Sequence, residues 1–237
     1  MKKILSIFFF IVICYSCFSQ KYKQGKLRNY QYVDYKKIHF GFSIGINYLD
    51  LSIKNAFYKD YKFQPILGEQ VKFSPGFTVA IVSDLKLNEN LNLRFLPGLT
   101  LGKRNVAFSN TDTIAEVETV YLDFPLLLKY KANRVNNFRP YIIGGISYRR
   151  DLEAKSKLSP NKLQFIKFNS NDVFAEFGFG IDSYLPYFKF STEIRVSIGF
   201  LNIINKEPDK DHLDLQHFSE AFSRVNSNVV SLIFHFE

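Results

Sequence analysis

Apolar and polar side chains alternate along the stretch KIHFGFSIGINYLDL, from Lys37 to Leu51. Every second residue from Ile38 to Tyr48 is apolar or aromatic, while the intervening positions carry mostly glycine, serine and asparagine. A strict period of two predicts a β-strand. Glycine packs nothing in an open strand, and a face turned to water normally carries longer polar side chains. We therefore expect the small residues to lie on a face that is crowded by side chains from the opposite wall.

Seven further segments alternate in the same way, and the connections between the segments alternate in length. Short turns are expected around residues 88–90, 132–137 and 184–187, with long loops over residues 52–75, 104–119, 151–172 and 201–228. An even number of antiparallel strands, with short turns at one rim and long loops at the other, is typical of a transmembrane β-barrel. We predict an all-β fold, an eight-stranded antiparallel up-and-down transmembrane β-barrel over residues 37–237. The segments after 37–51 are 76–85, 91–103, 120–131, 138–150, 173–183, 188–200 and 229–236.

The parity of the pattern predicts which face is inside. The apolar face has nearly no charge, so it is assigned to lipid, where a charge at the bilayer midplane is costly. The other face points into a lumen that eight strands leave only wide enough for side chains, and opposite charges buried there must pair. Tyr48, Tyr130 and Tyr148 face outward near strand ends, where aromatic girdles lie. The inward charged residues expected to pair are Arg94, Asp123, Lys129, Arg139, Glu176, Asp182, Glu193 and Arg195. The inward glycines expected to make room for them are Gly41, Gly45, Gly98, Gly102, Gly145, Gly178 and Gly180.

The N-terminal stretch MKKILSIFFFIVICYSCFSQ has the organisation of a secretory signal peptide. Lys2 and Lys3 form a basic region, an apolar run follows, and small residues precede a cleavage point before Gln20. We expect residues 1–19 to be removed; an N-terminal membrane anchor and lipidation at Cys17 are the alternatives. Both cysteines of the chain lie in this stretch, so the exported protein has no disulfide.

Residues 20–36 are polar, basic and aperiodic, and we read them as a flexible tail on the barrel. Residues 20–37 carry six basic residues and one acidic residue, out of a net charge of +9 for the whole chain. With eight strands, both termini lie on the short-turn side, which is the periplasmic side of such barrels. The tail is expected either to stay solvated or to touch an acidic partner.

No motif for catalysis, cofactor binding or nucleic-acid binding is visible, so we expect no catalytic, cofactor or metal residues. His39 and His235 share the inward parity on the first and last strands, which a closed barrel pairs. Their rings are expected to meet near the rim, as a metal or proton site or, in the preferred reading, as part of a packed polar plug.

The stretch EPDKDHLDLQH in the last long loop is rich in acidic residues and histidine but matches no known metal loop. Its candidate ligands are Asp209, Asp211, His212, Asp214 and His217. Four apolar residues in this region recur at helical spacing and predict a short amphipathic helix capping the barrel. They are Leu215, Phe218, Phe222 and Val225.

Several segments resemble a known family. YLDFPLLLKYK and NNFRPYIIGGISYRRDL resemble the fourth and fifth strands of small outer-membrane barrels of Bacteroidota. Together with HFGFSIGINYLDL and LNLRFLPGLTLGKR, they resemble the PorT (SprT) family of the type IX secretion system, over residues 37–237. The resemblance implies a non-enzymatic outer-membrane component required for export of proteins with a C-terminal sorting domain, and for gliding motility where that occurs. It offers no catalytic residues.

Three functional hypotheses follow. The first is a structural or assembly component of a secretion machine, in contact with outer-membrane lipid and with other type IX components, either the channel or the periplasmic machinery. The second is a free-standing barrel that binds ligands or surfaces through its four long loops. The third is an outer-membrane enzyme, which the absence of a serine, histidine or acidic constellation disfavours.

Overall fold

The computed structural model describes residues 29, 36–55, 68–70, 74–108, 114–154, 168–204 and 222–237. The expected signal peptide, and the expected tail apart from Asn29 and Lys36, lie outside these residues. The candidate metal-loop residues from Asp209 to His217 also lie outside them. Within the described ranges, no helix is long and apolar enough to cross a membrane.

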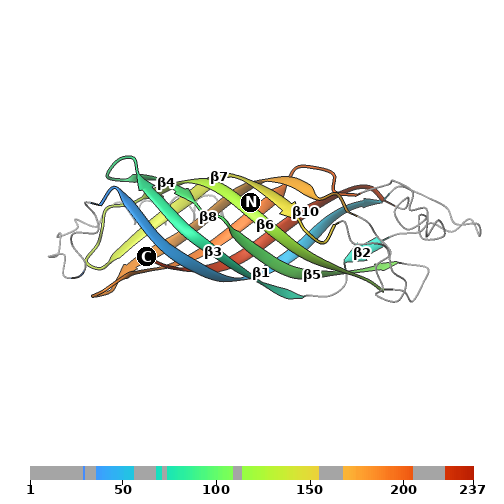
Figure 1. Cartoon of the computed structure of the whole chain (residues 1–237), viewed down its shortest axis with the longest axis horizontal. Helices are drawn as coiled ribbons and strands as arrows, with labels where there is room; N and C mark the ends of the chain where they lie inside the picture. The colour runs from blue at the N-terminus through green and yellow to red at the C-terminus, as the bar shows by residue number, and fades with distance from the viewer. Residues whose placement is uncertain are drawn as a thin grey trace, which may run out of the picture.

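The described chain forms ten strands in one antiparallel sheet (Figure 1). Their period-two patterns continue through long stretches, because alternate side chains face hydrocarbon and the lumen. The strands are β1 (Ile38–Asn55), β2 (Gly68–Gln70), β3 (Pro75–Lys86), β4 (Leu91–Phe95), β5 (Gly98–Phe108), β6 (Ile114–Lys131), β7 (Phe138–Asp151), β8 (Asn171–Tyr184), β9 (Lys189–Gly199) and β10 (Phe222–Phe236).

The sheet closes on itself, because β1 pairs with both β10 and β3. Nine of the described strands make up the ring, and β2 is a short addition to the edge of β5. β4 and β5 occupy one position in the ring: both pair with β3 and with β6, and they are separated at Pro97, which has no backbone N–H to donate. The ring therefore has eight positions, and the predicted eight-stranded antiparallel barrel is confirmed.

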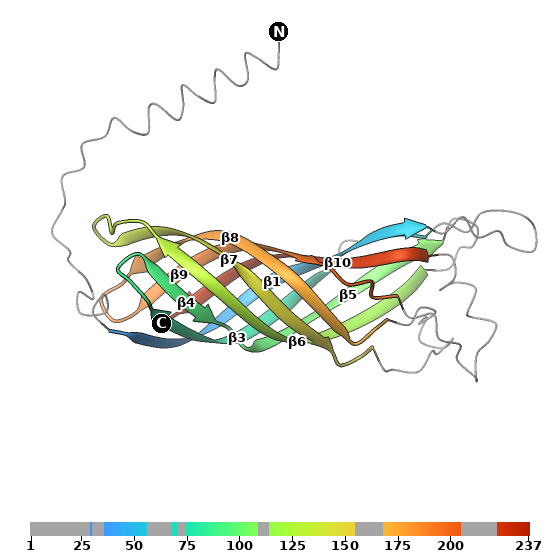
Figure 2. The ribbon, with the colours of Figure 1, turned by 90° about the horizontal axis from the view of Figure 1, so that it is seen from above.

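The three short turns lie together at one end of the barrel, which is at the left in Figures 1 and 2. Hydrogen bonds join neighbouring turns around this rim: Lys131 N donates to Asn90 O at 2.7 Å, and Tyr184 N donates to Asn137 O at 2.7 Å. The backbone of Glu237 pairs with Lys189 at the same rim, with N···O distances of 2.7 and 2.9 Å. The beginning of β1 and the end of β10 thus lie beside the short turns, as predicted.

Asn29, a residue of the expected tail, contacts this rim. Its side-chain amide donates to Tyr184 O at 3.1 Å, and its backbone N–H donates to Asn137 Oδ1 at 3.3 Å. Arg134 Nη2 donates to Asn29 O at 2.5 Å. One residue of the expected tail therefore contacts the turns that precede β7 and follow β8.

At the opposite end the strands are longer than the sequence pattern indicates. The expected long loop over residues 104–119 is wrong, because β5 continues to Phe108 and β6 begins at Ile114, with Asn105 opposite Glu116. The expected helix is wrong where it is described: Phe222 and Val225 belong to β10, and the Val225 side chain points inward with 1% of its surface exposed. Leu215 and Phe218 lie outside the described residues.

Candidate functional site

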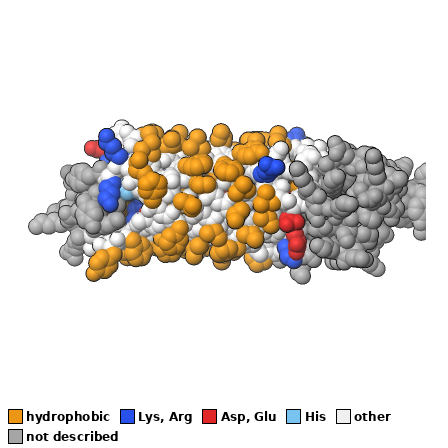
Figure 3. Space-filling model, in the orientation of Figure 1, with side chains coloured by type: hydrophobic (Ala, Val, Ile, Leu, Met, Phe, Trp, Pro, Cys, Tyr) orange, Lys and Arg blue, Asp and Glu red, His pale blue; other side chains and the backbone are white. Residues whose placement is uncertain are grey.

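The outer wall of the barrel is a continuous apolar belt. Figure 3 shows hydrophobic side chains across the middle of the described surface and charged ones toward its two ends. Ile146 on β7 and Phe177 on β8 are 62% and 60% exposed, which would be unfavourable in water but suits hydrocarbon. The predicted parity is therefore confirmed. Tyr130 and Tyr148 also face outward, and Tyr48 is half-buried.

The inward face carries the predicted charged residues, and all of them are buried. At two of the expected glycines the crowding neighbours are uncharged side chains: a Cβ on Gly180 would lie 2.6 Å from the Tyr141 hydroxyl, and one on Gly102 would lie 2.4 Å from Leu49 Cδ1. The predicted inward charges Arg94, Asp123, Lys129, Arg139, Glu176, Asp182, Glu193 and Arg195 are each at most 7% exposed.

A first cluster is built around an ion pair that joins β6 and β8, in the half of the lumen near the short turns. Lys129 Nζ lies 2.7 Å from Asp182 Oδ1, and both side chains are fully buried. Ser191 on β9 donates to the same carboxylate at 2.6 Å. The Lys129 ammonium also lies 3.7 Å from the centre of the Tyr141 ring, a cation–π contact. Four strands thus meet around one buried pair.

A second cluster is built around Arg94 of β4. Its guanidinium lies 2.6 Å from Asp84 of β3 and 2.7 Å from the side chain of Glu237. Lys189 Nζ lies 2.7 Å from the other Glu237 oxygen, and Asn92 donates to Asp84. The carboxylate of Glu237, whose inward position follows from the parity of β10, therefore links strands on opposite sides of the ring.

A third cluster occupies the middle of the lumen. Arg195 of β9 contacts Glu193 on its own strand and Glu176 of β8, the latter at 3.2 Å. Arg149 of β7 lies 2.6 Å from Glu176 and 3.2 Å from Asp123 of β6. Because Arg94 Nη1 also lies 4.0 Å from Glu193, cations and carboxylates alternate continuously from the short-turn rim to the centre.

The expected meeting of the two inward histidines is wrong. His235 lies opposite Ser43, four positions further along β1 than His39, because the β1–β10 register begins with Phe42 opposite Phe236. His39 lies opposite Asp84 of β3 instead. His235 is fully buried, with Nε2 3.2 Å from Glu193. It is part of the packed polar plug, and no group of three metal-ligand side chains occurs among the described residues.

Towards the long-loop end, an apolar layer crosses the lumen. The rings of Tyr121 and Phe174 meet edge to face with centroids 6.2 Å apart. Beyond them Arg104 is fully buried, and its Nη2 donates to the Ser227 hydroxyl at 2.5 Å and to the Tyr121 hydroxyl at 3.0 Å. The layer consists of Leu49, Tyr121, Phe174 and Val229.

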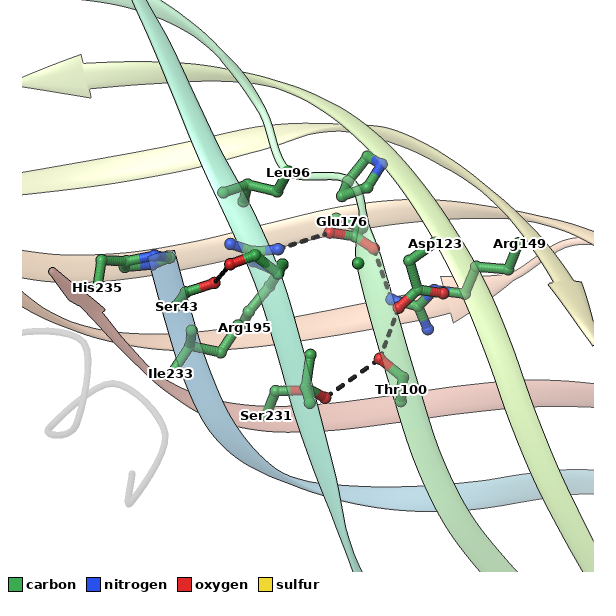
Figure 4. A pocket seen from close by; sticks show the side chains of 14 residues that line it. Ser43, Leu96, Thr100, Asp123, Arg149, Glu176, Arg195, Ser231, Ile233 and His235 are labelled. Carbon is green, nitrogen blue, oxygen red and sulfur yellow. Dashed lines mark hydrogen bonds and ion pairs between the residues drawn. The ribbon is translucent and has the colours of Figure 1, made fainter. Parts of the chain in front are cut away.

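A cavity of about 30 Å³ lies among the central charges (Figure 4). Thr100 donates to Asp123 at 2.6 Å on one side of it, and His235 lies on the other. A cavity of this size has room for a water molecule or two.

Among the described residues, and including Glu237, eight cations and eight carboxylates are buried, so the interior is electrically balanced.

This arrangement can hold the wall together and close the lumen. Each buried carboxylate of the three clusters contacts a cation, which offsets the desolvation that an unpaired buried charge would suffer. The predicted set of inward charges omitted Asp84, Arg149, Lys189 and Glu237 of the clusters, and Tyr141 was not singled out. Asp84 and Glu237 sit at strand ends, where the alternating pattern is short, and Tyr141 was overlooked although it shares the parity of Arg139.

Comparisons with known proteins give one family match and several structural matches. The family described as outer membrane protein beta-barrel domain matches residues 18–205. Neisserial surface protein A (NspA) is 10% identical, with a TM-score of 0.46 over 84% of this chain and 98% of that chain. OprG from Pseudomonas aeruginosa is 14% identical, with a TM-score of 0.47 over 83% of this chain and 91% of that chain. No curated protein matches the chain.

Proposed function

This chain belongs to the outer membrane protein β-barrel domain family, and from that premise we propose that it is a non-enzymatic structural or assembly component of the type IX secretion system. In this proposal the short-turn rim and both termini face the periplasm, as in bacterial barrels with short periplasmic turns. Lipid of the outer membrane surrounds the belt, and other secretion components contact the protein.

The filled lumen supports a role as a structural or assembly component and not as a conduit. A central cavity of about 30 Å³ between ion-paired side chains cannot pass a folded protein, or even an extended chain. The apolar layer of Leu49, Tyr121, Phe174 and Val229 adds a second barrier. A role in secretion must therefore work through contacts, either laterally with a larger channel or at the periplasmic rim.

The choice of secretion system rests on the resemblance of four segments to the PorT family. Two of them, LNLRFLPGLTLGKR and YLDFPLLLKYK, form β4, most of β5 and most of β6. Their inward residues Arg94, Asp123 and Lys129 belong to the ion-paired clusters, so these segments support a closed interior as well as an outer wall.

The absence of an enzymatic role is part of the proposal. The ionisable side chains of the three clusters are paired with one another inside a closed wall, where substrate has no access. Catalytic groups need an accessible pocket with converging polar atoms.

The deciding experiment measures cargo in the culture medium of a deletion strain. We expect secretion of proteins with a C-terminal sorting domain to stop, while the outer membrane otherwise stays intact. Full-length protein should restore secretion. Normal secretion by the deletion strain would overturn the proposal and favour the free-standing barrel that binds through its loops.

A second arm of this experiment tests the tail. Complementation with residues 21–36 removed shows whether the basic tail is a contact of the machine. Loss of rescue supports the tail, provided the variant reaches the outer membrane. The variant Asn29→Ala removes only the side-chain hydrogen bond to Tyr184 and serves as the narrower comparison.

A further inference from the structure

The outer wall of the barrel is indented where β3 begins. β1 pairs with β3 only up to Tyr48, opposite Pro75, although β1 continues to Asn55. On the other side, β5 pairs with β3 only up to Leu101 and continues to Phe108. A groove of about 860 Å³ lies at this point, between β1, β3, β5 and β6.

The walls of the groove are mostly apolar. Ile46, Phe77, Leu101 and Val120 line it, and all four have the parity that faces lipid. Phe77 and Leu101 are 47% and 42% exposed. Thr119, of the inward parity, also lines the groove, so the groove reaches into the thickness of the wall.

Two polar features accompany these apolar walls. Lys103 and Glu118 lie across β5 and β6 at the groove, with Nζ and Oε1 2.8 Å apart and both side chains about half exposed. The Thr119 hydroxyl is buried and has no hydrogen-bond partner in the described structure. A positive charge, a negative charge and a hydroxyl thus lie beside one apolar groove.

We propose that this groove binds one acyl chain of a membrane lipid whose headgroup carries both a phosphate and an ammonium, that is, a phosphoethanolamine lipid. The chain covers Ile46, Phe77 and Leu101, the phosphate lies at Lys103 and the ammonium at Glu118. This inference rests only on the membrane location of the barrel and not on a role in secretion.

Both the acyl chain and the headgroup have a physical reason to bind at the groove. An apolar groove that opens to hydrocarbon offers water too few polar partners, and left empty it forfeits dispersion contacts, so an acyl chain fills it. An exposed ion pair contributes little stability, so a headgroup with the complementary pair of charges can associate with Lys103 and Glu118 at small cost.

Tryptophan fluorescence can test the proposal, because the chain contains no Trp. Phe77→Trp places a reporter in the groove, and Phe177→Trp places a control reporter on the outward face of β8. Each protein is folded into phosphatidylcholine vesicles with the same fraction of brominated phosphatidylethanolamine or brominated phosphatidylglycerol. At Phe77→Trp we expect phosphatidylethanolamine to quench about two- to fivefold more effectively, the range for one exposed ion pair. At Phe177→Trp the two lipids should quench equally.

Charge variants on the Phe77→Trp background separate headgroup recognition from general lipid contact. Glu118→Gln removes the partner of the ammonium and should shift the preference toward phosphatidylglycerol. Lys103→Gln removes the partner of the phosphate, which both lipids carry, so it should weaken quenching by both lipids while the preference for phosphatidylethanolamine remains. Arg150→Gln, at an exposed position near the loop end of β7, is the matched control and should change nothing. Equal quenching by both lipids at the groove, or a preference that survives Glu118→Gln, would overturn the proposal.

A groove-filling variant provides an independent check. Val120→Phe narrows the groove and should reduce quenching of Phe77→Trp by either lipid, whereas Val196→Phe on β9 should not. Folding of each variant is verified by its altered gel mobility before and after heating. If Phe77→Trp fails to fold, Leu101→Trp reports from the same groove, and unchanged quenching on Val120→Phe would contradict occupancy.

Discussion

Asp182 illustrates how single residues hold this barrel together from the inside. Its fully buried carboxylate accepts hydrogen bonds from Lys129 at 2.7 Å and from Ser191 at 2.6 Å. Removing one partner of a buried ion pair leaves an uncompensated charge and costs about 3–5 kcal/mol. We expect Asp182→Leu to lower the free energy of unfolding by that amount, measured by urea titration in lipid vesicles.

The double variant Lys129→Met/Asp182→Leu is the control for this prediction. It removes both charges, so most of the lost stability should return. If the double variant lost as much stability as the sum of Asp182→Leu and Lys129→Met measured separately, the ion pair would not be the cause.

Phe177 and Leu126 test the outward face at the level of single residues. Their side chains are 60% and 46% exposed on the belt, where an arginine costs about 2–4 kcal/mol near the bilayer midplane. We expect Phe177→Arg and Leu126→Arg to block assembly into vesicles, measured as folding yield. Ser147→Ala, on the buried inward face where the hydroxyl has no hydrogen-bond partner, should fold normally. Equal yields for all three would mean that the inside and outside faces are reversed.

At the scale of elements, the turn between β6 and β7 depends on one backbone conformation. Asn136 has a φ of 54°, and it is the one non-glycine residue with a positive φ among those described. Asparagine tolerates this region better than β-branched residues do. We expect Asn136→Ile to destabilise the barrel by about 1–3 kcal/mol, while Asn136→Gly leaves the free energy of unfolding nearly unchanged. A loss of similar size with glycine would point to the Asn136 side chain rather than its φ.

The strands within the apolar belt could be predicted because lipid and lumen impose opposite demands on alternate residues. This signal fades toward the long-loop end, where inward positions become apolar, as at Leu51 and Val225. The first strand was therefore expected to end at Leu51 rather than Asn55, and the last to begin at Val229 rather than Phe222. The helical spacing of Phe222 and Val225 was coincidental.

The inward charges could be predicted from parity, but their partners could not. Pairing depends on the register between strands and on the tilt of the wall, which bring together residues far apart in the chain, such as Arg94 and Glu237. The misplaced contact between His39 and His235 has the same origin, because the register of β1 and β10 was unknown.

For the whole molecule, closure of the ring predicts unusual behaviour on gels. β1 pairs with β10 along fourteen residue pairs from Phe42 to Asn55, so detergent leaves the ring closed until heat separates the strands. We expect the purified protein to migrate differently before and after boiling, with a circular dichroism spectrum dominated by β-structure. A spectrum that shows mainly helix, or solubility without detergent, would contradict the barrel.

The filled lumen predicts that the barrel is not permeable to small solutes. Paired charges around a cavity of about 30 Å³ and the apolar layer beyond them leave no path for a sugar or a peptide. Vesicles containing the protein should therefore swell in an isosmotic solution of arabinose no faster than empty vesicles, while vesicles with a general porin swell rapidly. If the protein accelerated swelling to the rate of a porin, the side chains would not close the lumen in the membrane. A conduit would then have to replace the proposal of a component that acts through its wall and rim.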